Sequence, residues 1–166
     1  MHGATVRNMS DPILLCTDGS RHAAHAISSG LALVGSDGPI VVATVLHEPD
    51  PMLVTGTGIA GGVMSSEAFE EQLQASRRDG EALVASVVAD LGLTGAEVRI
   101  LVGDPGMQIC LLAEQTSARA IVIGSRGRGG LKRAILGSVS DHVVRHAPCP
   151  VIITGPEADP DIDATS

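Results

Sequence analysis

Residues 13–20 read Ile-Leu-Leu-Cys-Thr-Asp-Gly-Ser, four apolar residues followed by a polar turn. A short apolar run that ends in such a turn is typical of a buried strand. Ser20, or Gly19 beside it, then begins a stretch of helical periodicity that runs to about Val34 and stops at Gly35. The segment therefore predicts a strand, a tight turn and a helix in immediate succession.

The same alternation continues along the chain. Further short apolar runs, rich in Val and Ile, occupy residues 40–46, 98–102, 120–123 and 151–153. Helical periodicity is found between most of them, at residues 67–91, 105–116 and 138–146. Runs with so few polar residues indicate central parallel strands that are buried on both faces. We therefore expect an α/β fold: a single three-layer, Rossmann-like domain with a five-stranded parallel sheet and helices on both faces.

Two later helices have recognisable starts in the sequence. Asp104 is a favourable N-cap and is followed by Pro105, a residue that suits the first helical position. Ser138 stands three residues before Asp141, which fits a capping box at the start of the last helix. In a parallel sheet of this kind, ligands bind where strands end and such helices begin.

The composition excludes several classes of function. The formal net charge of −8 disfavours a general nucleic-acid binder, which needs a basic face to neutralise phosphates. Phe69 is the only Phe, Tyr or Trp in 166 residues, so aromatic platforms for single-stranded nucleic acid are missing as well. No apolar run approaches the length that crosses a bilayer, so we expect no contact with a membrane.

The sequence also leads to expectations about the cell compartment and the bounds of the domain. Residues 1–10 contain no apolar core of a secretory signal. Cys16, Cys110 and Cys149 are odd in number and lack zinc-like spacing, which favours reduced thiols in the cytoplasm. We expect one domain at residues 10–155, with flexible tails at residues 1–9 and 156–166.

A glycine-rich loop joins the fourth apolar run to the last helix. It reads Gly-Ser-Arg-Gly-Arg-Gly-Gly-Leu-Lys-Arg-Ala-Ile-Leu-Gly-Ser from Gly124 to Ser138. Glycines allow the backbone to approach an anion closely, and the N–H groups of a helix start point toward it. The loop holds four of the eleven Lys and Arg residues of an acidic chain, Arg126 and Arg128 among them. This concentration of positive charge indicates a ligand that carries phosphate.

The spacing of this loop resembles a known family. Gly124, two residues, Gly127, nine residues and then Gly137-Ser138 are similar to the ATP-binding motif of the universal stress proteins. The resemblance extends over nearly the whole domain, because residues 13–20, 101–105 and 146–153 resemble the opening strand, a strand-to-helix turn and the closing strand of that family. It implies ATP as the ligand. The presence of Mg²⁺ stays open, because the loop offers no carboxylate to fix a metal.

The resemblance also implies roles for individual residues. Asp18 would lie near the ribose or adenine, with Thr17 and Cys16 at the same strand end, and Val45 would meet adenine through its backbone. The expected contacts with ribose and phosphates are Gly124, Arg126, Gly127, Gly137, Ser138, Val139 and Ser140, and Arg128 is a further basic candidate.

The expected function is that of a nucleotide-dependent regulatory module in the stress response, acting on an unknown partner protein. By resemblance it would be a homodimer that pairs through the last strand, at Val151, Ile152 and Ile153. Three alternatives stay open: a slow ATP hydrolase or phosphotransferase, a homodimeric adaptor with an empty loop, and a pocket that prefers AMP or cyclic AMP. No catalytic residue can be identified from the sequence.

Overall fold

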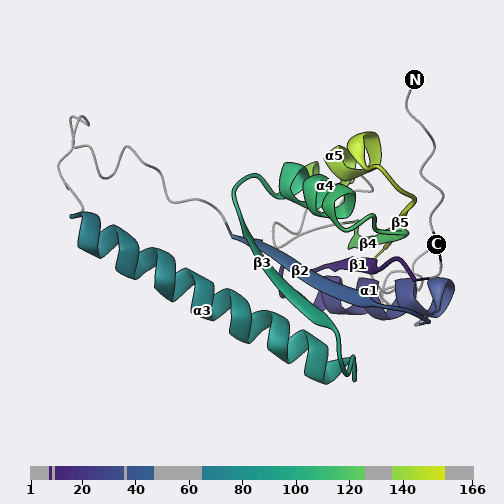
Figure 1. Cartoon of the computed structure of the whole chain (residues 1–166), viewed down its shortest axis with the longest axis horizontal. Helices are drawn as coiled ribbons and strands as arrows, with labels where there is room; N and C mark the ends of the chain where they lie inside the picture. The colour runs from purple at the N-terminus through teal and green to yellow at the C-terminus, as the bar shows by residue number, and fades with distance from the viewer. Residues whose placement is uncertain (1–7, 9, 36, 47–64, 126–135, 156–166) are drawn as a thin grey trace, which may run out of the picture.

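The computed structural model describes residues 8, 10–35, 37–46, 65–125 and 136–155. Figure 1 shows strands that alternate with helices along the chain. The strands are β1 (Ile13–Cys16), β2 (Ile40–Leu46), β3 (Glu97–Val102), β4 (Ala120–Gly124) and β5 (Val151–Thr154). The helices are α1 (Arg21–Val34), α3 (Ser66–Asp90), α4 (Pro105–Gln115) and α5 (Ser138–His146).

All five strands are parallel and lie in the order β3-β2-β1-β4-β5. The chain moves outward from β1 toward β3 and then crosses back to β4, on the other side of β1. In parallel sheets of this type, ligands bind at such a switch point, beyond the carboxyl ends of the strands. The β1–β4 junction, where Cys16 pairs with Ile123, is therefore the place in the sheet where a site is expected.

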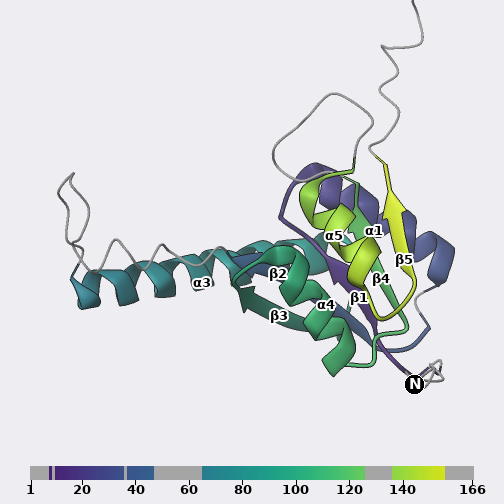
Figure 2. The same cartoon turned by 90° about the horizontal axis from the view of Figure 1, so that it is seen from above.

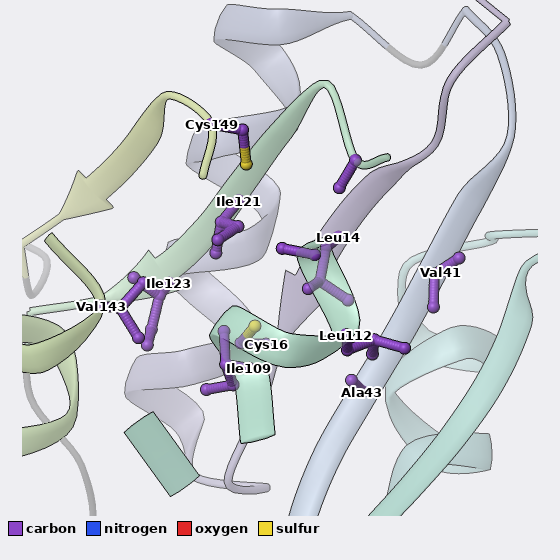
Figure 3. Close-up of a cluster of buried hydrophobic side chains, with 12 residues drawn as sticks. Leu14, Cys16, Val41, Ala43, Ile109, Leu112, Ile121, Ile123, Val143 and Cys149 are labelled. Atoms are coloured by element: carbon purple, nitrogen blue, oxygen red, sulfur yellow. The ribbon is translucent and has the colours of Figure 1, made fainter. Parts of the chain in front are cut away.

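The core has one layer on each side of the sheet. Leu14 and Cys16 of β1 pack with α4 and α5, while Ile13 and Leu15 point to the opposite layer, formed with α1 and α3. Figure 3 shows Cys16 close to Ile109 of α4 within the first of these layers. Burial on both faces explains why β1 is a continuous apolar run, and it confirms the predicted three-layer fold.

The expectation that all five apolar runs are central strands was wrong for two of them. β3 and β5 lie at the two edges of the sheet. The first half of β3 is exposed, with Val98 at 40% of its full accessibility. An edge strand has a neighbour on one side only, so it tolerates the charged residues Glu97 and Arg99 on either side of Val98.

The helix starts follow the sequence with one exception. Ser20 and Asp104 are the N-caps of α1 and α4, and Pro105 begins α4, as predicted. The capping box predicted for α5 was wrong. Gly137 is the N-cap of that helix, Ser138 is its first residue, and no side chain caps it. Among the described helices, none is both long enough and apolar enough to cross a membrane.

Candidate functional site

The turn after β1 is held by its own side chains. Thr17 Oγ1 accepts a hydrogen bond from the N–H of Gly19 at 3.0 Å, and Asp18 Oδ1 accepts one from the N–H of Ser20 at 2.9 Å. Gly19 has a φ of +78°, a conformation that glycine adopts without strain. The turn therefore fixes Asp18 at the end of β1. Within the described part of the chain, its second carboxylate oxygen has no hydrogen-bond partner.

The ends of the glycine loop are tied together beyond β4. Gly137 donates its N–H to the carbonyl of Ser125 at 2.9 Å, and Ser125 donates its own N–H to the carbonyl of Thr154 at 2.9 Å. The Ser140 hydroxyl lies 2.9 Å from the Gly137 carbonyl and 3.3 Å from the Ser125 carbonyl, and this serine is only 2% exposed. These bonds join the two ends of the loop in a closed neck, which is defined by Ser125, Gly137 and Ser140.

The start of α5 differs from the other described helix starts. Ser20, Ser65 and Asp104 each accept a hydrogen bond from a backbone N–H in the first turn of α1, α3 and α4. No side chain does this for α5. Its first-turn N–H groups, with the positive end of the helix dipole, can therefore receive an anionic ligand.

These features lie at the same edge of the sheet. Because Cys16 pairs with Ile123, the turn at Thr17 and Asp18 and the neck at Ser125 leave adjacent strands together. Figure 2 shows β1 and β4 side by side, with α5 over one face of the sheet. The arrangement places a carboxylate and uncapped N–H donors at the same edge of the sheet, which suits a ligand with both hydroxyl and phosphate groups.

The remaining predicted site residues are in four situations. Cys16 and Val139 turn their side chains toward the core between the sheet and α4 and α5, so that only their backbones could serve a ligand. Val45 is half-buried near the end of β2, and Gly124 ends β4 opposite Thr154. Ser138 is exposed at the first position of α5. The residues Arg126, Gly127 and Arg128 lie outside the described part of the chain.

From the sequence, Ser125 was included in the glycine-rich loop without a role of its own, and Thr154 was not identified. Both act through backbone groups, which leave no trace in residue type. Ser125 could have been noticed only from its position directly after the predicted strand.

Among the described residues, the thiols and imidazoles do not form a reactive centre. Burial raises the pKa of the Cys16 thiol far above its ordinary value, and burial also raises that of Cys110. His142 and His146, four residues apart on α5, stack with ring centroids 4.3 Å apart. The described residues contain no group of three His, Cys, Asp or Glu side chains that could hold a metal ion.

Comparison with known proteins gives a consistent result. The model of the universal stress protein family matches residues 9–155. A universal stress protein of Thermus aquaticus is 32% identical over 145 residues, which cover 87% of this chain and 98% of the relative.

Solved structures show the same fold. The protein MJ0577 of Methanocaldococcus jannaschii superposes with a TM-score of 0.72 at 22% identity, covering 92% of this chain and all of that one. A family member from Arabidopsis thaliana with AMP bound has a TM-score of 0.57 at 22% identity, covering 90% and 94% of the two chains. A universal stress protein in complex with cAMP has a TM-score of 0.51 at 22% identity, covering 87% and 95%.

Proposed function

The chain belongs to the universal stress protein family, and from this membership we propose that it is a cytoplasmic regulatory module that binds an adenine nucleotide. Relatives of the same fold are described with AMP or cAMP bound. The nucleotide would act as a signal, and its binding would change the surface offered to a partner protein in the stress response. The proposal assigns no catalytic residue.

One observation carries this proposal: α5 begins without a side-chain cap at the switch point of the sheet. Its free N–H groups would receive the phosphates, and the Asp18 carboxylate would accept hydrogen bonds from the ribose hydroxyls. The closed neck at Ser125 and Gly137 fixes where the glycine loop leaves and re-enters the fold. Of the predicted contacts, Gly124, Gly137 and Ser138 would act at the phosphate end, and Val45 would meet the adenine.

The structure suggests a different role for Ser140 from the direct phosphate contact that the resemblance implied. Its hydroxyl is buried and directed at the carbonyls of the neck. We therefore propose that Ser140 positions the loop, while the backbone N–H groups and Ser138 face the phosphates.

ATP is the proposed ligand because the spacing of the glycines is that of the ATP-binding motif. The four basic residues of the loop suit a chain of several phosphates better than a single one. The described residues do not fit a protein-bound Mg²⁺. Asp141, the nearest carboxylate on α5, is paired with Arg145 through two bonds of 3.0 Å. We therefore propose that any divalent ion is held by the phosphates of the nucleotide and not by this carboxylate of α5.

We also propose that the protein is a homodimer that pairs through β5. Val151, Ile152, Ile153 and Thr154 are half-buried at the edge of the sheet, where β5 pairs with β4 on one side only among the described strands. Val144 on α5 is 47% exposed. An apolar edge strand of this kind is a surface that a second copy can cover.

The test is calorimetric titration of the purified protein with ATP, AMP and cAMP, together with chromatography of any small molecule released on denaturation. We expect ATP to bind at one per chain and more tightly than the other two. Gly137→Ala places a methyl group at the start of α5 and should weaken binding. Gly155→Ala is the matched control, because a Cβ at Gly155 meets no atom within 4 Å.

Each alternative has its own outcome. Tighter binding of AMP or cAMP would support the proposed nucleotide site but would rule out ATP as its preferred ligand. Release of inorganic phosphate with turnover, lost in Gly137→Ala, would identify an enzyme. Folded protein that binds none of the three nucleotides would reject the proposal in favour of an adaptor.

A further inference from the structure

The first half of α3 extends beyond the sheet (Figures 1 and 2). The second half is anchored: Gly80, Val84 and Val87 are buried, and a Cβ at Gly80 would lie 3.1 Å from Leu46 of β2. From residue 67 to residue 79, by contrast, no side chain is buried. A helix needs a packed face for its stability, so a projecting half with an apolar stripe calls for a partner.

The apolar stripe of α3 continues into this projecting half. Phe69 and Leu73 are four residues apart, and helical periodicity places them on the same face as Gly80 and Val84. Neither Phe69 nor Leu73 is among the side chains that pack against the core layer beneath α3. The apolar face by which α3 packs on the sheet therefore continues into the half of the helix that extends beyond the sheet.

Charges divide the same segment into two halves. Glu67, Glu70 and Glu71 come first, and Arg77 and Arg78 follow, with Asp79 as the last residue of the segment. Glu70 and Arg77 are separated by seven residues, about 10.5 Å along the axis, which is too far for a pair within one helix. The described residues form two ion pairs, Glu97–Arg99 and Asp141–Arg145, and neither involves this segment.

We propose that residues 66–79 of α3 pair antiparallel with the same segment of a second copy of this chain. A two-fold axis near Leu73 would bring the two Leu73 side chains together and place Glu70 opposite the partner's Arg77. By symmetry, Arg77 would face the partner's Glu70. In a parallel pair, Glu70 and Arg77 of the two copies would lie on opposite flanks of the contact and would not meet, so only the antiparallel arrangement pairs these charges.

The size of the segment sets the strength of this contact. Fourteen helical residues extend about 21 Å. Two helices in contact over that length bury less than the ~1,200 Å² of a typical stable interface. The contact is therefore weak and concentration-dependent, and it is separate from β5. It requires no nucleotide, so it stands or falls independently of the proposed function.

Charge reversal in the full-length protein tests the proposal by sedimentation velocity over a range of concentrations. Glu70→Arg and Arg77→Glu, made singly, each convert two attractive pairs into repulsive ones and should weaken this association step at least about tenfold. The double variant restores both pairs in reversed order and should recover the wild-type constant. Glu71→Arg changes the same charge on the opposite side of the helix, so it is the matched control and should leave association unchanged.

The outcomes are distinct. Weaker association in both single variants, together with a wild-type association constant in the double variant, supports the antiparallel pair. This holds whether the step joins monomers or dimers formed through β5. An association constant that is unchanged in all four variants would overturn the proposal. The apolar stripe would then contact another part of the chain or another protein. A double variant that stays weak, while circular dichroism shows an intact fold, would overturn it as well.

Discussion

Two helices leave the same edge of the sheet with opposite chemistry at their starts. At α4, Asp104 accepts the N–H of Met107 at 2.8 Å and Pro105 occupies the first position, so the sequence itself satisfies the helix start. At α5, Gly137 provides no side chain, and the bonds of the neck leave the first-turn N–H groups of this helix without a side-chain acceptor. A helix start without a side-chain cap, in a fold whose other described helices are capped, is therefore available to a ligand.

The largest effect is expected when α5 is given the kind of side-chain cap that α4 has. Gly137 has φ −65° and ψ 157°, which Asp adopts without strain. Gly137→Asp should therefore raise stability by about 0.5 kcal/mol. Its carboxylate would occupy the donors and repel phosphate, so nucleotide affinity should fall about 100-fold. Calorimetry and thermal melting measure the two effects, and the neutral Gly137→Ser separates charge from capping.

Removing the neck bond should have a smaller effect on the same site. Ser140→Ala deletes the hydroxyl that reaches the Gly137 and Ser125 carbonyls. We expect a loss of about 1 kcal/mol in the free energy of unfolding and about tenfold weaker nucleotide binding. Denaturant titration and calorimetry on the same preparation are the measurements. Unchanged affinity with lowered stability would show that Ser140 serves the fold alone.

The reciprocal change at α4 should affect stability only. Asp104→Ala removes the cap on the N–H of Met107 and should cost about 1 kcal/mol in the free energy of unfolding. Nucleotide affinity should stay at the wild-type value, because this helix start is not part of the proposed site. A loss of binding in this variant, measured at a temperature where it remains folded, would contradict the distinction between the two helices.

The smallest effect concerns Asp141 in the first turn of α5. Its side-chain hydrogen bond to Arg145 holds the pKa of this carboxyl below its ordinary value. The small stabilisation from this pair is therefore present above the ordinary carboxyl pKa and is lost as pH falls through the lowered pKa. Arg145→Ala should raise the pKa of Asp141, as seen by NMR titration. It should also free the carboxylate beside the helix start, weakening nucleotide binding about twofold to threefold. An unchanged pKa would rule out this pairing in solution.

The sequence was sufficient for most of the fold because buried parallel strands need continuous apolar runs. The bounds predicted for β1 and β2 agree with the structure, and so does the Asp104-Pro105 start of α4. The order of the strands in the sheet could not be predicted in the same way. Whether residues 98–102 lie at the centre or at the edge depends on what packs beside them, and the charges at Glu97 and Arg99 were the only local indication.

The site was less predictable for a related reason. Gly137 and Ser138 are both acceptable N-caps, so local sequence could not choose between an open and a capped helix start. The neck joins Ser125 to Ser140, fifteen residues apart, and depends on where β4 and α5 meet. The roles of Arg126, Gly127 and Arg128 stay predictions, since these residues lie outside the described part of the chain.

The most direct test of the central claim is to follow the backbone amide resonances of ¹⁵N-labelled protein while ATP is added. We expect the amides of Ser138, Val139 and Ser140 to shift together with those of Asp18 and Gly19, while the amide of Met107 at the capped start of α4 does not shift. Saturating shifts at Met107, or none at Ser138 to Ser140, would rule out a phosphate site at the start of α5.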